Sequence, residues 1–352
     1  IKEEFQVSNG LDELIPRKIE TIYFFNWFDI GKETGYVLAN RFFNKNTVIV
    51  KPDEFLYFEN GKVIKYFKDK EIVRQRVERS KELKDIVPEL TNISEHFYSY
   101  NFIDGKTLPK INNVSLFREL LNYCKNTIWG EKSIDLKKRQ EFKKRCKEFY
   151  EEKTYKRLEL FYSKGDIKDR EEIVNGESIP KTRELLSRID WDRLVNGIPV
   201  SFHGDFQPEN ILVCREGFKL IDWRQNFAGT TEYGDIYYDF AKMHHALIVT
   251  HEVIRNNQFE VTEKNGIVNY DFFLKSNLAE YKDIFENFIK DNGYDLDKLR
   301  IISALTFLNI APLHHHPYDK FLYYIGKYTL NKELNHNNSY KLNNQIEIKE
   351  LA

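Results

Sequence analysis

Alternating apolar and polar residues mark the early part of the chain. Residues 47–50, 55–58 and 62–67 are short segments rich in Val, Ile, Phe and Tyr, as β-strands usually are. Asn60 and Gly61 separate the last two segments, and this dipeptide favours a two-residue hairpin turn. The pattern therefore predicts a small antiparallel β-sheet.

The third segment carries a lysine among apolar residues. A period of two places Val63, Lys65 and Phe67 on one face of the strand, so Lys65 would project beside an apolar wall. Residues 69–84 then show the apolar spacing of an amphipathic helix, with Asp69 in position to cap its first turn. A strand lysine is more often a solvated edge charge, so the pattern alone leaves the role of Lys65 open.

Helical spacing dominates the remainder of the chain, with two exceptions. Residues 97–105 form an aromatic strand that ends in a turn, and two apolar segments on either side of Arg215-Glu216-Gly217 indicate a second β-hairpin. Residues 115–195 are strongly charged, with apolar residues at helical intervals. These elements predict an α+β chain with a small β-rich lobe and a larger, mostly helical lobe.

The second hairpin would gather three polar side chains. Asp205 and Asn210 lie on the loop that enters it, and Asp222 follows its last strand, 17 residues after Asp205. Asp205 could accept the proton of an attacking alcohol, and the oxygen atoms of Asn210 and Asp222 are hard ligands that suit Mg²⁺. The pattern indicates phosphoryl transfer. The simpler alternative is that both aspartates only cap turns.

The same stretch resembles a known family. The sequence H-G-D-F-Q-P-E-N at residues 203–210, followed by I-D-W at residues 221–223, resembles the motif of aminoglycoside phosphotransferases, choline kinases and related small-molecule kinases. This resemblance implies an α+β, bilobal protein-kinase-like fold and the cofactors ATP and Mg²⁺. It implies Asp205 as the catalytic base, with Asn210 and Asp222 as metal ligands.

The resemblance covers about residues 47–330 and extends to the nucleotide site. It implies that Lys65 binds phosphate and that Glu78, a residue of the predicted helix, holds this lysine in place. Glu71 and Glu82 on the same helix are rival candidates.

The resemblance also assigns residues to adenine, loop support and substrate. These are the main chain of Asn101 and Phe102 for ATP binding, His203 and Asp239 for structural support of the catalytic loop, and Arg224 and His315 for the substrate. A surface salt bridge is the alternative for Arg224.

The three adjacent histidines at residues 314–316 suggest a metal site, but neighbours on an irregular segment cannot all face one ion. Substrate contact or core packing is the better interpretation of these histidines.

Other classes of protein remain as alternatives. The motif parallels the H-R-D-L-K-P-E-N loop of protein kinases, but Gln207 replaces its lysine, Gly204 replaces its arginine and no A-P-E follows. A glycine-rich phosphate loop is also missing, because Lys51-Pro52-Asp53-Glu54 joins the first two strands. The non-enzyme alternative is a pseudokinase or nucleotide-sensing module, which would have no chemical need for all the polar residues of the site.

The first residues carry a second, shorter resemblance. Within residues 19–40, W-F-D-I-G with Y-x-x-A soon after resembles the closing segment of sugar nucleotidyltransferases. It implies that residues 1–45 end an upstream domain of a bifunctional enzyme. The alternative is an amphipathic extension packed on the kinase. The predicted organisation continues with an N-lobe at 46–103, a C-lobe at 104–330 and a polar tail at 331–352.

Composition narrows the expected partners. The net charge of −1 gives no excess of positive charge that would attract nucleic acid or an anionic membrane. The expected partner is therefore a small-molecule acceptor. The three cysteines form no C-x-x-C pair, and no apolar run approaches the roughly 18 residues that span a bilayer, which favours a cytoplasmic protein. The acceptor stays open among sugars, polyols and amino alcohols, with choline or aminoglycosides as alternatives. The nucleotidyltransferase resemblance favours a sugar or polyol, for cell-envelope polysaccharide precursors.

Overall fold

The computed structural model describes residues 53–165 and 167–350, with side chains up to residue 336. These residues belong to one compact unit that begins at Asp53. The predicted strand at 47–50 and the predicted nucleotidyltransferase segment lie outside the described residues. Within the described residues, no helix combines the length and apolar character needed to cross a membrane.

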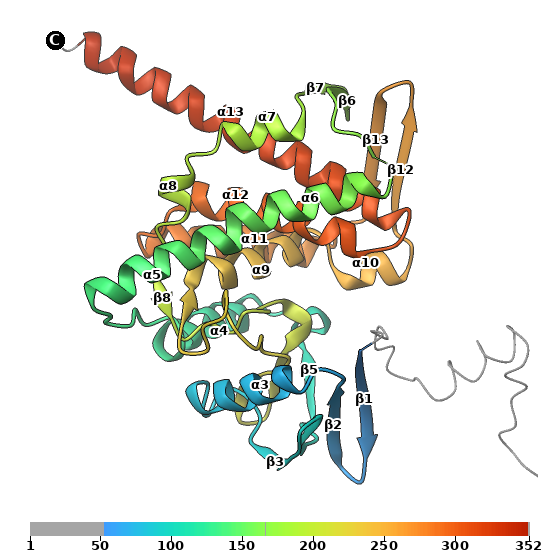
Figure 1. The fold of residues 1–352 in the computed structure, drawn as a ribbon, viewed down its shortest axis with the longest axis vertical. Helices are drawn as coiled ribbons and strands as arrows, with labels where there is room; N and C mark the ends of the chain where they lie inside the picture. The colour runs from blue at the N-terminus through green and yellow to red at the C-terminus, as the bar shows by residue number, and fades with distance from the viewer. Residues whose placement is uncertain (1–52, 166, 351–352) are drawn as a thin grey trace, which may run out of the picture. The chain divides into compact units, whose positions relative to one another are not determined.

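The N-lobe is an antiparallel sheet covered by one helix (Figure 1). Its strands are β1 (Glu54–Glu59), β2 (Lys62–Phe67), β3 (Leu90–Ile93) and β4 (Phe97–Asn101), in the order β1-β2-β4-β3. Asn60 and Gly61 both have positive φ, 50° and 71°, as the predicted hairpin turn requires. The helix α3 (Lys70–Glu82) begins at Asp69, whose side chain accepts a hydrogen bond from the Glu71 main chain.

A second small sheet leads into the C-lobe. Strand β5 (Gly105–Thr107) follows a short link after β4 and pairs with β9 (Ile211–Cys214), which in turn pairs with β10 (Gly217–Leu220). The strands β9 and β10 form the hairpin predicted around residues 215–217. This sheet places the motif at residues 203–210, which directly precedes β9, next to the link between the lobes.

Helices build the rest of the C-lobe, and α12 lies at its centre against α6, α9 and α13. The longer helices are α4 (Val114–Thr127), α5 (Leu136–Lys147), α6 (Lys153–Ser163), α9 (Ile236–Ile248), α11 (Ser276–Asp291), α12 (Leu296–Ile310) and α13 (Tyr318–Glu350). Shorter elements are α7 (Thr182–Ser187), α8 (Trp191–Leu194), α10 (His251–Arg255), β8 (Pro199–Val200) and β11 (Gly234–Asp235). The predicted α+β, two-lobed arrangement is confirmed. The tail boundary predicted at residue 331 falls inside α13, where Asn331 and Leu334 are buried.

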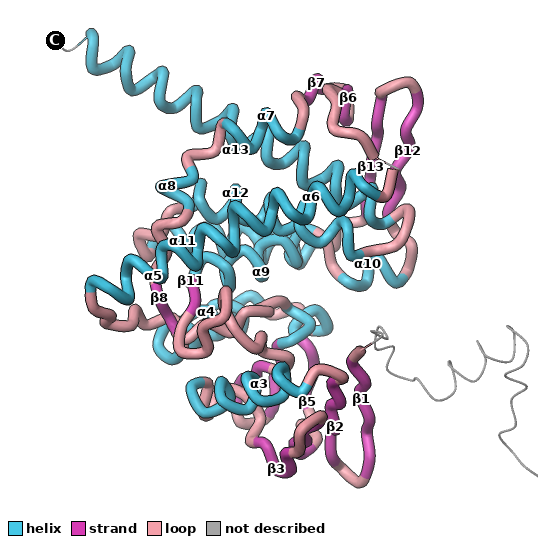
Figure 2. The backbone as a smooth tube through the Cα atoms, in the orientation of Figure 1, coloured by secondary structure: helices cyan, strands magenta, loops and turns pink. Residues whose placement is uncertain are grey.

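One sheet of the C-lobe has no counterpart in the sequence analysis. Figure 2 shows its strands at the end of the helical lobe, away from the N-lobe. They are β6 (Glu172–Val174), β7 (Glu177–Ile179), β12 (Phe259–Lys264) and β13 (Ile267–Phe272). The three-residue strands β6 and β7 are too short to show a period of two.

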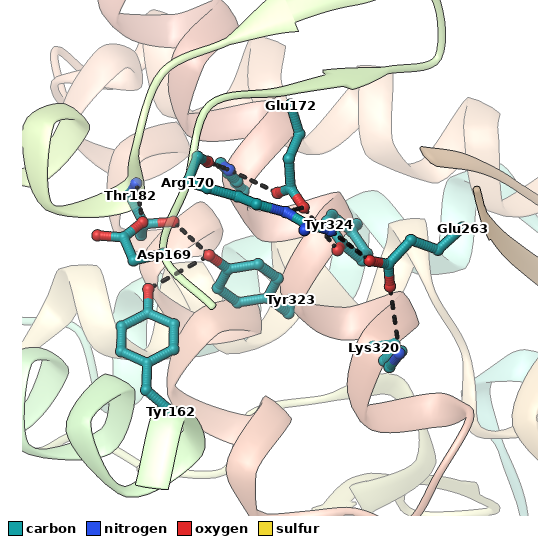
Figure 3. A network of polar contacts seen from close by, with 10 residues as sticks. Tyr162, Asp169, Arg170, Glu172, Thr182, Glu263, Lys320, Tyr323 and Tyr324 are labelled. Atoms are coloured by element: carbon teal, nitrogen blue, oxygen red, sulfur yellow. Dashed lines mark hydrogen bonds and ion pairs between the residues drawn. The ribbon is translucent and has the colours of Figure 1, made fainter. Parts of the chain in front are cut away.

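A buried polar network joins this sheet to α13 (Figure 3). Glu172 Oε2 pairs with Lys327 Nζ at 2.8 Å, and both side chains are almost fully buried. Tyr324 and Arg170 donate to the other carboxylate oxygen of Glu172, at 3.1 and 3.0 Å. Each buried charge has an opposite charge and further hydrogen bonds, and the network adds to the packing of Phe321 of α13 on rings of β12 and β13.

Candidate active site

The loop of residues 201–210 carries the predicted catalytic base. Asp205 Oδ2 accepts a hydrogen bond from Asn210 Nδ2 at 3.0 Å, and Asp205 Oδ1 pairs with Lys242 Nζ at 2.7 Å. Burial opposes the charge of Lys242, but Asp205 and other neighbours together raise the pKa of this ammonium above its ordinary value. The structure therefore brings Asp205 and Asn210 together and adds a cation that the sequence analysis did not select.

Asp239 anchors the loop through the loop's main chain. Its carboxylate accepts hydrogen bonds from the N–H groups of His203 (2.7 Å) and Gly204 (2.6 Å), and from Trp129 Nε1 (3.2 Å). Asp239 is fully buried, and burial raises its pKa to about 6 against the effect of these hydrogen bonds. The position of the loop thus depends on one buried carboxylate of α9.

Two loop residues that precede Asp205 shape the turn. Gly204 has φ +86°, and a Cβ there would lie 2.5 Å from the Cβ of Arg224, so only glycine fits. His203 is fully buried, and its Nδ1 accepts a hydrogen bond from the Asp205 main chain at 3.3 Å. Burial lowers the pKa of His203 to about 3, so the ring is neutral near pH 7 and supports the loop without carrying charge.

Asp222 lies just beyond β10, where the two lobes meet. Its carboxylate forms an ion pair with Lys65 of β2 and lies 3.8 Å from the Arg76 guanidinium. The N–H of Ile221 donates to the Asn210 carbonyl at 2.9 Å, which holds Asn210 and Asp222 on neighbouring chain segments. A side-chain amide oxygen and a carboxylate at this point are donors that fit a Mg²⁺ ion.

Trp223 ties this segment to the N-lobe. The indole is fully buried, stacks on Tyr98 of β4 with ring centroids 5.8 Å apart, and donates to the Arg76 carbonyl at 2.9 Å. Asp222 itself has φ +62°, a left-handed conformation that Asp tolerates better than most residues. The position of Asp222 is therefore set by contacts with both lobes.

In the described part of the chain, the Glu78 carboxylate contacts Thr231 and Arg74. Glu78 is exposed on α3, accepts a hydrogen bond from Thr231 Oγ1 at 2.8 Å and lies 3.4 Å from an Arg74 nitrogen. The buried polar positions of α3 are instead Arg76 and Arg79. Glu78 is therefore engaged by Thr231 and Arg74 in this structure, and its implied role in holding Lys65 stays a prediction.

Replacing Glu78 by Ala is expected to change kcat/KM for ATP by less than about threefold, because ion pairs between exposed side chains contribute only roughly 0–1 kcal/mol. Steady-state assays at varied ATP concentration test this. Lys65→Met is the comparison variant and should lose most activity, because it removes the cation beside Asp222. A tenfold or larger rise in KM for ATP in Glu78→Ala would support the implied role of Glu78 in holding Lys65.

The proposed adenine contacts lie at the end of β4. The Phe102 N–H donates to the Gly61 carbonyl at 2.8 Å, so this group is already engaged within the N-lobe. Hydrogen bonding alternates along an antiparallel pair, so the peptide groups of Asn101, opposite Lys62, are directed away from β2. Of the two predicted positions, Asn101 therefore keeps main-chain groups that could face a nucleotide base.

The two substrate candidates have different surroundings. The Arg224 guanidinium lies 5.3 Å from the ring centroid of Phe149 and 5.8 Å from that of Tyr238. Both rings line a pocket that Lys242 also lines, next to Asp205. His315 is exposed in the turn before α13 and is not part of this pocket lining. Arg224 thus lies over two rings of this pocket, whereas His315 is not among the residues that line it, and the substrate roles of both stay predictions.

A family comparison covers the segment with these features. Residues 145–259 match the model of the phosphotransferase enzyme family, and this span contains the loop, the β9–β10 hairpin and Asp239. This segment is similar to the phosphotransferase enzyme family. The predicted resemblance is thereby confirmed, and the match supports the prediction of a phosphotransferase. A comparison with curated protein sequences finds no match.

Several solved structures of kinases are similar to the chain. An ethanolamine kinase from Plasmodium vivax is 15% identical, with 95% of each chain covered and a TM-score of 0.41. A choline kinase from Cryptosporidium parvum is 13% identical, with 86% of this chain and 89% of that chain covered and a TM-score of 0.36. A glucosamine kinase is 12% identical, with coverage of 83% and 80% and a TM-score of 0.41. These similarities do not bear on the substrate of this protein.

Proposed function

We propose that the protein is an ATP- and Mg²⁺-dependent kinase that phosphorylates a hydroxyl group of a small polar metabolite. The observation that carries this proposal is the convergence of Asp205, Asn210, Asp222 and Lys65 where the two lobes meet. A base, two oxygen donors for a cation and a phosphate-binding cation are the groups that phosphoryl transfer to an alcohol requires.

The acceptor side of the mechanism centres on Asp205. Its carboxylate accepts the hydroxyl proton as the acceptor oxygen attacks the γ-phosphorus. Asn210 and Lys242, at 3.0 and 2.7 Å, orient the carboxylate. Lys242 also lies close enough to the reaction to offset negative charge on the transferred group.

The nucleotide side uses Lys65, Asn210 and Asp222. Asn210 and Asp222 would hold Mg²⁺, which when bound neutralises charge on the nucleotide phosphates. Lys65, now paired with Asp222, would bind a phosphate oxygen of ATP. The main chain of Asn101 would hydrogen-bond the adenine.

A coupled ADP-release assay with ATP and Mg²⁺ tests this function. The acceptor panel contains sugars, polyols, hydroxy acids, amino alcohols including choline, and aminoglycosides. We expect ADP release that depends on one class of acceptor and on Mg²⁺. If calorimetry shows tight ATP binding but no acceptor on the panel is phosphorylated, a nucleotide-sensing module becomes the better hypothesis.

A further inference from the structure

The pocket beside Asp205 is formed by helices of the C-lobe. It lies where a π-helical turn (Glu148–Glu152) leads into α6, with α9 and α12 on the other sides, and it is a small cavity of about 40 Å³ that opens to solvent. Lys242 contributes to its wall and pairs with Asp205, so the pocket opens next to the proposed base. An open pocket whose wall combines apolar rings with a few convergent polar groups is the usual form of a small-molecule site.

The charged groups of this pocket are all positive. Lys153 and Lys242 line it, Arg224 lies over two of its rings, and none of its lining residues is Asp or Glu. No carboxylate of the described residues pairs with the Lys153 ammonium. Burial lowers the pKa of Lys153 well below its usual value, with Arg224 and Lys242 among the neighbours that add to this effect. An anion in the pocket would relieve this repulsion between cations.

The aromatic rings of the pocket already hold cations of the protein itself. The Lys153 Nζ lies 4.0 Å from the ring centroid of Phe149 and 5.8 Å from that of Tyr238. Arg224 lies over the same two rings. Rings of this kind could otherwise form a cage for a quaternary ammonium group. A cationic acceptor would have to displace Lys153 and Arg224 or lie beside two like charges.

We propose that the acceptor carries an anionic group, a carboxylate or a phosphate ester, in addition to the hydroxyl group that is phosphorylated. This inference rests on the proposed kinase function and names the class of its substrate. Lys153 and Arg224 bind the anionic group by charge-assisted hydrogen bonds, and Lys242 stays with Asp205. A hydroxyl of the acceptor can donate to Asn309 Oδ1, a buried pocket atom that has no hydrogen-bond partner among the described residues.

The transfer step leaves the anionic group unchanged. A bond forms between the acceptor hydroxyl oxygen and the γ-phosphorus of ATP, and the bond between that phosphorus and the ADP oxygen breaks. The hydroxyl proton passes to Asp205. The products are ADP and an acceptor that carries one additional phosphoryl group.

The first test compares acceptors of matched shape and different charge with the unaltered protein. One set is glycerol, glycerate and glycerol phosphate, and each larger polyol or sugar is paired in the same way with its acid and its phosphate ester. Ethanolamine and choline are the cationic members. We expect kcat/KM to be at least about tenfold higher for anionic members, as one charge-assisted hydrogen bond provides. A comparison of the acid with the phosphate ester in each set shows which of the two anionic groups the pocket prefers.

The second test is the variant Lys153→Met. Its matched control is Lys156→Met on the exposed side of α6, where Lys156 lies 3.8 Å from Glu152. We expect Lys153→Met to raise KM for the anionic acceptor about 10- to 100-fold. The Kd for ATP and the kcat at saturation should change by less than about threefold. The control should match the unaltered protein in all three quantities, and thermal unfolding shows whether each variant is folded.

The outcomes separate this inference from the kinase assignment. Turnover that favours neutral or cationic acceptors, or an unchanged KM for anionic acceptors in a folded Lys153→Met variant, would overturn the anionic acceptor and leave the kinase in place. A lack of turnover with every acceptor would contradict both. The acceptor comparison uses only the unaltered protein, so it decides the question even if the variant does not fold.

Discussion

Replacing Asp205 by Asn is expected to lower the phosphorylation rate by roughly 10²- to 10⁴-fold, the range of general-base assistance. The amide keeps the size of the carboxylate but removes the basic oxygen that receives the proton. The Kd for ATP with Mg²⁺ should change little, because Asp205 acts on the acceptor side of the site. Calorimetry for the nucleotide and an ADP-release assay for the reaction measure the two quantities separately.

The matched control for this variant is Asp192→Asn. Asp192 is almost fully exposed and pairs with Lys143 at 3.1 Å, so its loss removes the same charge without touching the site. It should retain full activity. If Asp205→Asn also retains near-normal turnover, Asp205 is not the proton acceptor, and the sensing alternative gains no support from this variant.

Replacing Asp222 by Ala is expected to abolish Mg²⁺-dependent turnover while the protein stays folded. The carboxylate is the proposed ionic ligand of the metal, and its loss leaves Lys65 and Arg76 beside each other without the anion that lies between them. Asn210→Ala should be less severe, because it removes a neutral ligand. Turnover measured across a Mg²⁺ titration tests both variants, and an Asp222→Ala protein with normal Mg²⁺-dependent turnover would remove the metal assignment.

A second substitution at this position separates ligand loss from backbone strain. Asp222 has φ +62°, where Ala costs about 1–2 kcal/mol and Asn is tolerated. Asp222→Asn therefore keeps the conformation and removes only the charge. Equal losses of turnover in the Ala and Asn variants, with a lower melting temperature only for Ala, would assign the catalytic defect to the carboxylate.

The core of the site could be predicted from the sequence because it is local. Asp205, Asn210 and Asp222 belong to one loop and one hairpin, and hydrogen bonds between neighbouring segments bring them together. The period of two in β2 likewise placed Lys65 on the buried face, with Val63 and Phe67 on either side. Backbone geometry over a few residues determines these positions, whatever packs around them.

The buried side chains of α3 could not be predicted from local sequence patterns. Apolar spacing predicts which side of a helix is buried only when apolar residues fill that side, and arginine is usually exposed. Here Arg76 and Arg79 are buried because their guanidinium groups lie over aromatic rings, 4.7 Å from Phe67 and 3.8 Å from Phe202. Those rings come from a strand and a loop outside the helix, so only the folded arrangement turns Glu78 outward.

The sequence by itself therefore indicated the family resemblance, the two-lobed α+β fold and the residues that share one hairpin. The tertiary structure decided which distant charges meet them. Lys242 could have been noticed, since it follows Asp239 by three residues and so lies on the same side of α9. No such signal pointed to Lys153, because α6, α9 and α12 enclose the pocket only after segments more than 40 residues apart pack together. Local geometry follows from the order of residues, whereas the electrostatic character of a pocket depends on which helices pack around it.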